Sequence, residues 1–202
     1  GLVYLTSEAA EDTPNIGDLM EMLAGLELSY KFEDAIVNGS GANKPLGLIN
    51  AGCKIAVDKV TNQTATTIWA QNILDMMGRL WGPSQRTAVW LYNQDALPQL
   101  SSLALDSTYG SAGSVQVAAP LWNWDGNAAS GGWPTLAGRP AIPTEHCKTL
   151  GSEGDLILCD LSQYLVAMKS RTDTSLHIRF LTDEQAFRFV LRCDGAPTWA
   201  EA

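Results

Sequence analysis

The sequence predicts an α+β protein whose first part is rich in helix and whose last part is built from strands. Two observations carry this prediction: a long segment with helical spacing of apolar residues near the start, and five strand-like segments after residue 136. Because helices and strands follow one another in blocks and do not alternate, a parallel α/β fold is disfavoured. A chain of 202 residues suits one domain or two closely joined domains.

The first long element is a helix predicted over residues 14–37. Thr13 is the expected N-cap and Pro14 the first helical residue. Residues 2–5 before it have strand character from the start, which suggests that the sequence is a trimmed piece of a longer chain. The face expected to be buried consists of Ile16, Leu19, Met20, Leu23, Leu26, Tyr30 and Val37, widened by a second line of Leu28, Phe32 and Ile36.

Shorter elements follow a loop rich in Gly and Asn at residues 38–45. In chain order, the sequence predicts a short strand at residues 54–57, a helix capped by Thr66 and ending near residues 82–83, a buried strand at residues 88–92, and a short helix capped by Asn93.

The last third of the chain is predicted to be β-structure. Residues 101–135 before it contain many Gly, Ser and Ala residues and are expected to be mainly irregular. In the last strand, apolar and mostly charged side chains alternate, which is typical of a sheet with one buried face. The predicted strands cover residues 138–143, 155–160, 164–169, 176–180 and 187–192.

Charge and composition narrow the function classes. The chain carries 13 Lys and Arg against 22 Asp and Glu, a net charge of −9, and the cations form no run. Binding driven by neutralisation of phosphates needs a basic face, so sequence-specific nucleic-acid recognition is not expected. No stretch approaches the ~18 apolar residues of a membrane-spanning helix, and no membrane partner is expected.

Catalytic motifs are weak. Ser40 and Ser111 lie in short Gly/Ser turns, but neither stands in a Gly-x-Ser-x-Gly elbow, and His146 and His177 are the only candidate bases. The Gly residues after the long helix lack the spacing of a phosphate-binding loop, and Pro45 stands where that loop needs a hydroxyl residue. We therefore expect no catalytic residues, although a serine hydrolase remains the enzyme alternative.

The cysteines do not form a metal-ligand pattern. No Cys-x-x-Cys pair occurs, and the adjacent His146 and Cys147 cannot easily chelate one tetrahedral ion. Without a secretory signal, reduced thiols are expected at Cys53, Cys147, Cys159 and Cys193. No metal and no cofactor are predicted.

Aromatic residues are the remaining candidates for a functional surface. Seven Trp residues are many for this length and indicate large contacts in the core or between subunits. Core packing and contact with neighbouring subunits both stay open for the cluster near the irregular stretch. The candidate interface residues are Tyr109, Trp122, Trp124 and Trp133.

Several segments occur in an order that matches a known family. The strongest is Lys-Phe-Glu-Asp-Ala-Ile-Val-Asn-Gly-Ser-Gly at residues 31–41, followed by Pro-Leu-Gly-Leu at 45–48. Further matching segments are residues 7–14, the helix after Asn93, and residues 136–144, 154–164 and 183–195. In this order the chain resembles the major capsid proteins of tailed bacteriophages and prophages, which have the Hong Kong 97-type fold.

The resemblance implies a long spine helix with a peripheral sheet and a compact α+β axial domain. Residues 1–60 would be peripheral, residues 61–172 axial, and residues 173–202 the return strands of the peripheral domain and a tail whose last residues rejoin the axial domain. The stretch at residues 103–134 would lie near the capsomer axis. Family members also carry an N-terminal arm and an extended loop, which this sequence lacks, so monomers or small ring-like oligomers are expected in place of closed shells. Residues 175–178 contain no Asn, so no cross-linking role is carried over.

The leading hypothesis is a capsid shell subunit that assembles with itself into hexamers and pentamers around DNA. Scaffold, portal and maturation protease are the further partners that the resemblance implies, with assembly in the bacterial cytoplasm. An encapsulin-like compartment shell is the close alternative. A secreted binding module using the Trp-rich loop is an alternative from a different class.

Overall fold

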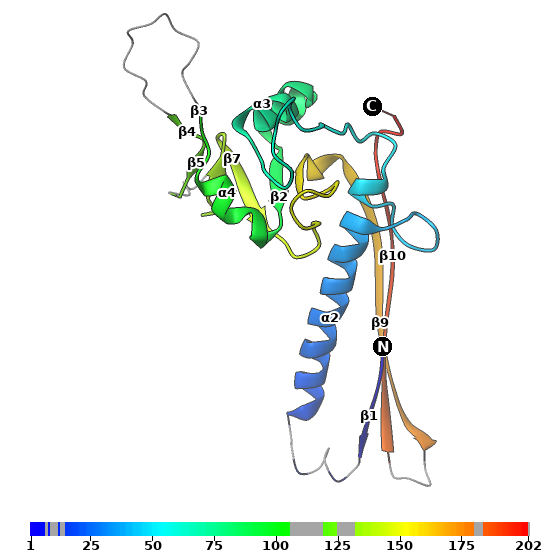
Figure 1. Ribbon diagram of the computed structural model, residues 1–202. Coiled ribbons are helices and arrows are strands. Elements are labelled where there is room, and N and C mark those ends of the chain that lie inside the picture. The colour runs from blue at the N-terminus through cyan, green and yellow to red at the C-terminus, as the bar shows by residue number, and fades with distance from the viewer. Residues whose placement is uncertain are drawn as a thin grey trace, which may run out of the picture. The chain divides into compact units, whose positions relative to one another are not determined.

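The chain forms a mixed α+β structure, so the expected fold class is confirmed. The computed structural model describes residues 1–6, 8, 12, 15–105, 119–124, 132–179 and 184–201. These residues form a three-stranded, a five-stranded and a two-stranded sheet (Figure 1). The chain divides into two compact units: unit 1 is residues 1–50 and 165–196, and unit 2 is residues 51–164 and 197–202. The peripheral and axial roles expected for the ranges 1–60, 61–172 and 173–202 stay predictions.

Unit 1 contains one sheet and one long helix. Its sheet has the order β1–β10–β9, in which β10 is the central strand. β1 pairs with β10 in antiparallel orientation, with Leu2 opposite Arg188 and Thr6 opposite Glu184. The Gly1 ammonium group extends this pairing, because it donates a hydrogen bond to the Phe189 carbonyl at 2.8 Å. The elements are β1 (Leu2–Thr6), α2 (Ile16–Asn38), the 3-10 helix η1 (Leu48–Asn50), β9 (Tyr164–Arg179) and β10 (Glu184–Pro197).

The helix α2 confirms the long predicted helix, whereas its predicted capping residues Thr13 and Pro14 lie outside the described residues. The expected buried face is wrong in part, because four of its ten members are between 44% and 59% exposed: Leu19, Leu23, Leu26 and Tyr30. The second line of Leu28, Phe32 and Ile36 is the half-buried one. The helix carries apolar residues on two sides, and spacing alone does not tell which side the rest of the unit covers.

A glycine turn, residues 38–50, fastens the end of α2 to the sheet of unit 1. The Gly39 N–H donates to the Ala35 carbonyl at 3.0 Å, and the Gly47 N–H donates to the Gly39 carbonyl at 2.9 Å. The Asn50 side chain donates to the carbonyls of Asn38 and Gly39. The Leu46 N–H then donates to the Gly195 carbonyl of β10 at 2.7 Å. Because backbone atoms of neighbouring segments lie in direct contact with Gly39 and Gly47, these two positions have no room for a side chain.

Unit 2 has a sheet of mixed orientation and the main hydrophobic core. The strand order is β5–β6–β7–β2–β8, in which β2 is parallel to β7 and antiparallel to β8. The core contains Ile73, Trp90, Leu100 and Leu136, each fully buried, and the Trp90 indole N–H donates to the Leu136 carbonyl at 3.0 Å. The strands are β2 (Val89–Tyr92), β3 (Ala104–Leu105), β4 (Ala119–Pro120), β5 (Trp122–Asn123), β6 (Thr135–Leu136), β7 (Arg139–Pro143) and β8 (Leu156–Cys159).

The helices of unit 2 are short. Asn93 is confirmed as a cap, because its side chain accepts a hydrogen bond from the Asp95 N–H at 3.0 Å. Asn93 caps a short 3-10 helix, and the helix α4, which carries the buried Leu100, begins directly after it at Leu97. The elements are α3 (Ala70–Arg79), α4 (Leu97–Ser101) and the 3-10 helices η2 (Pro83–Arg86), η3 (Gln94–Ala96) and η5 (Leu161–Gln163).

Three local predictions are wrong. Thr66 does not cap α3: its φ is 58°, its hydroxyl donates to the Ala65 carbonyl, and the helix begins only at Ala70. Residues 54–57 form no strand, since none of the described strands pairs with them. The two strands expected at residues 164–169 and 176–180 are one continuous strand, β9. Backbone pairing with β10 carries the strand through the polar residues between them, because an exposed strand tolerates such residues.

Candidate subunit interface

The candidate interface residues belong to an aromatic cluster in unit 2. The Trp122 ring lies between two other rings, with T-shaped contacts to Tyr92 at 5.8 Å and to Trp124 at 5.4 Å between ring centroids. Trp122 is 4% exposed, whereas Trp124 is 63% exposed. The three rings therefore lead from the core of unit 2 to its surface.

Strand geometry explains this placement. Trp122 pairs with Leu136 in the antiparallel pair β5–β6, and Leu136 is part of the core. Alternate residues of an extended segment point to the same side, so Trp124 follows Trp122 on that side just after the strand ends. Burial raises the pKa of Tyr92, which keeps this ring neutral. The Trp122 indole N–H has no hydrogen-bond partner in the described part of the chain, so this ring contributes by packing alone.

The two interpretations of the Trp cluster thus apply to different residues. Trp122 is a core residue. Trp124 and Trp133 are surface residues, the latter 44% exposed. Tyr109 lies outside the described residues.

A second aromatic pair on the surface was not predicted from the sequence. The rings of Trp81 and Trp199 make a T-shaped contact at 5.6 Å between centroids, although each side chain is more than half exposed. The tail that carries Trp199 is held by Thr198, whose N–H and hydroxyl both donate to the Gln163 carbonyl at 2.8 Å. No local pattern predicts a contact between residues so far apart in sequence.

The described residues do not assemble a catalytic site. Ser40 is exposed and forms a single bridge with Leu46 in the glycine turn of unit 1. His146 is buried in unit 2. Ser111 and the side chain of His177 lie outside the described residues, so the structure does not bear on them.

The described residues form no metal-ligand cluster and no activated thiol. Among the described residues, no group of three or more His, Cys, Asp or Glu side chains is placed to hold a metal ion. All four cysteines are free. Burial raises the pKa of the Cys147 thiol to about 12, and the negative charge of Asp155 adds to this shift. Burial likewise raises the pKa of Cys159 to about 12. Both thiols are therefore protonated and weakly nucleophilic at neutral pH.

No described helix is long and apolar enough to cross a membrane.

The surface is apolar in places: five of the seven Trp side chains, at positions 69, 81, 124, 133 and 199, are at least 40% exposed. Trp is enriched where protein interfaces bury their anchors. The exposed side chains thus favour contact with another protein.

Comparison with known proteins agrees with this picture. A search of curated proteins found no match. Among solved structures, the chain is similar to the capsid of an empty GTA particle and to the capsid of a native GTA particle, both computed with C5 symmetry, each with a TM-score of 0.70 and 14% identity. Each similarity covers 98% of this chain, and 68% and 67% of the respective capsid chains. These similarities support the fold.

The sequence itself identifies the family. A family model described as the phage capsid family matches residues 1–202, the whole of the chain. The match agrees with the spine-like helix α2, the long strands of unit 1 and the exposed aromatic side chains. The chain therefore belongs to the phage capsid family and is a major capsid protein, a structural component of the virion shell.

Proposed function

We propose that copies of this chain assemble into pentamers and hexamers, the capsomers from which the icosahedral shell around the DNA of a tailed phage or prophage is built. The observation that carries this proposal is the exposure of five Trp side chains on one chain. Large exposed apolar surface on a soluble protein marks a place where another molecule binds. In a shell, that molecule is the next copy of the same chain.

The proposal assigns a role to each unit. Unit 1, with its long helix and long strands, forms the periphery of a capsomer, and unit 2 forms the compact part around the capsomer axis. The net charge of −9 agrees with a shell wall that does not bind the enclosed polyanion. Scaffold, portal and maturation protease are further partners in this proposal, and assembly takes place in the bacterial cytoplasm.

Trp124 and Trp133 are the proposed anchors between neighbouring copies. Trp124 rests on the buried Trp122, so its ring is held in place before any contact forms. A side chain that is already ordered loses little conformational entropy on binding, which makes it an effective interface anchor. Tyr109 belongs to the same proposed interface by its place in the sequence alone.

The chain is proposed to have no catalytic activity. Ser40 is exposed in a turn of unit 1, and no histidine side chain of that unit is described next to it. Ester hydrolysis measured with generic esters for the wild-type chain and for Ser40→Ala and Ser111→Ala tests this point directly. Activity that either replacement removes would contradict it.

The assembly proposal is tested with purified protein by sedimentation velocity and negative-stain electron microscopy. Wild-type protein is expected to form ring-shaped oligomers of five or six copies at high protein concentration. Trp124→Ala is expected to weaken this association at least tenfold, in the range of a hot-spot residue. Ile55→Ala, which removes an exposed apolar side chain that is not among the five Trp residues, is the matched control. Protein that stays monomeric under all conditions would contradict the proposal.

A further inference from the structure

The helix α2 carries an apolar stripe whose side chains are largely exposed. This outer stripe is on the side opposite the half-buried line of the helix, since its members recur at helical spacing. Their exposed fractions run from 44% to 62%. The outer stripe consists of Leu19, Met22, Leu23, Leu26 and Tyr30. A contiguous face of this size marks a docking surface.

The rim of the outer stripe is acidic. Asp18, Glu27, Glu33 and Asp34 are all exposed along α2. The helix contains one cation, Lys31, whose amino group lies 3.8 Å from the Glu27 carboxylate. Two α2 helices packed face to face would bring like charges together, which opposes association. The occupant of the stripe is therefore expected to be apolar with a basic rim.

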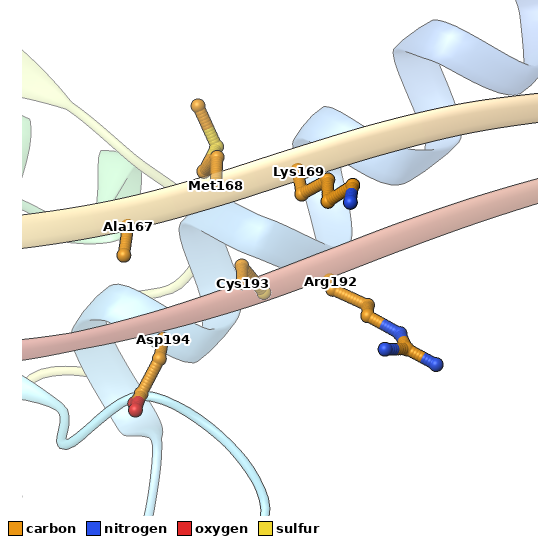
Figure 2. A pocket seen from close by; sticks show the side chains of 6 residues that line it. All are labelled: Ala167, Met168, Lys169, Arg192, Cys193 and Asp194. Atoms are coloured by element: carbon orange, nitrogen blue, oxygen red, sulfur yellow. The ribbon is translucent and has the colours of Figure 1, made fainter.

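The sheet of unit 1 carries such a basic face. In Figure 2, Ala167, Lys169, Arg192 and Asp194 point to one side of β9 and β10, and Met168 points to the other. These residues line a surface hollow of the sheet together with Cys193. Lys169 and Arg192 are both exposed and have no ion-pair partner in the described part of the chain.

Alternation along the strands extends this basic face. Arg171 lies on the same side as Lys169, and Arg188 on the same side as Arg192. Arg188 is exposed, and Leu2 pairs directly with it, so the half-exposed Leu2 side chain joins the same face. Arg171 is neutralised by Asp173 at 2.7 Å. The basic face, defined as Lys169, Arg171, Arg188 and Arg192 with Leu2, thus combines apolar surface with an excess of cations over the carboxylates of Asp173 and Asp194 on the same side.

We propose that the outer stripe of α2 in one copy docks on the basic face of the sheet in a second copy of this chain. The two surfaces are complementary in charge and alike in apolar character, and β10, about 46 Å long at 3.3 Å per residue, is long enough to receive α2, about 35 Å long at 1.5 Å per residue. The contact joins two different surfaces, so it repeats head to tail, and it forms a ring when the rotation between neighbouring copies closes after five or six copies. This inference rests on the proposed shell function and deepens it by naming the contact.

Charge reversal tests the contact. The variant Lys169→Glu with Arg192→Glu changes the basic face, and the variant Asp18→Lys with Glu27→Lys changes the rim of the outer stripe. Each is expected to weaken self-association in sedimentation velocity at least tenfold, and the variant with all four changes is expected to regain it. Lys59→Glu with Lys148→Glu, two exposed cations of unit 2, changes the net charge equally and is expected to have no such effect.

The outcomes separate this contact from the shell function. If wild type and all variants form the same rings, the docking is overturned while the shell function stands. If the four-change variant stays as weak as the two-change variants, the docking is also overturned. If the wild-type chain never associates, both proposals fall. Binding of a short DNA duplex that Lys169→Glu with Arg192→Glu abolishes, with self-association unchanged, would assign the basic face to nucleic acid and overturn the docking.

Discussion

The glycine turn allows one prediction to be worked out from the structure. A methyl group added at Gly47 would lie 2.7 Å from the Val37 carbonyl oxygen and 2.9 Å from the Asn38 carbonyl carbon, and it would also overlap the Gly39 nitrogen. The backbone at Gly47 is not in the left-handed region, so the effect of Gly47→Ala is steric. All three contacted atoms belong to backbone that cannot rotate away.

The expected cost follows from these contacts. Forcing a methyl group into packed structure costs about 1–3 kcal/mol. Separating the segments also weakens the hydrogen bond from the Gly47 N–H to the Gly39 carbonyl, worth about 1 kcal/mol. We expect Gly47→Ala to lower the free energy of unfolding by about 3 kcal/mol, and the melting temperature by about 6–12 °C for a chain of this size.

Urea and thermal unfolding followed by far-ultraviolet circular dichroism measure this loss, and hydrogen exchange in α2 locates it. Gly25→Ala is the matched control, because a methyl group at Gly25 meets nothing within 4 Å in the middle of α2. That change is expected to stabilise the helix by up to about 1 kcal/mol. Equal stability of Gly47→Ala and wild type would refute the reasoning that close backbone contact requires glycine at this position.

Three further predictions concern unit 2. Trp90→Phe leaves the buried Leu136 carbonyl without its donor and is expected to reduce the unfolding free energy by about 3 kcal/mol, as chemical denaturation would show. Because the pKa of Cys147 is raised to about 12 in the folded state, the unfolded chain loses this proton first, so stability is expected to fall as the pH rises from about 9 towards 12; Cys147→Ala should flatten this slope. Trp199→Ala removes the ring contact with Trp81 and is expected to cost about 1 kcal/mol and to expose the tail to proteolysis, which a carboxypeptidase digest followed by mass spectrometry detects.

Local patterns were sufficient where local interactions decide the structure. The α2 helix, the strand at β2 and the cap at Asn93 all follow from residue spacing or from a side chain that bonds its own neighbours. Thr66 shows where this reasoning fails. Threonine is a favoured helix-capping residue, but the Thr66 backbone is left-handed and its hydroxyl donates to the Ala65 carbonyl.

The candidate interface shows a similar division. Composition alone indicated that Trp residues would form large contacts, and the order of short motifs indicated a capsid protein. Neither could separate the buried Trp122 from the exposed Trp124, two residues away on the same side of an extended segment. That difference depends on where the core of unit 2 ends.

By itself, the sequence determined the α+β class, the long helix, the acidic charge and the family. Only the tertiary structure decided which side of α2 is covered, because the helix is apolar on two sides and hydrophobic burial has no direction of its own. Only the tertiary structure joined residues 164–179 into one strand and brought Trp81 against Trp199, because such contacts depend on segments far apart in the chain. The residues that face a neighbouring copy are those that the single folded chain leaves exposed, and spacing along the sequence does not reveal them.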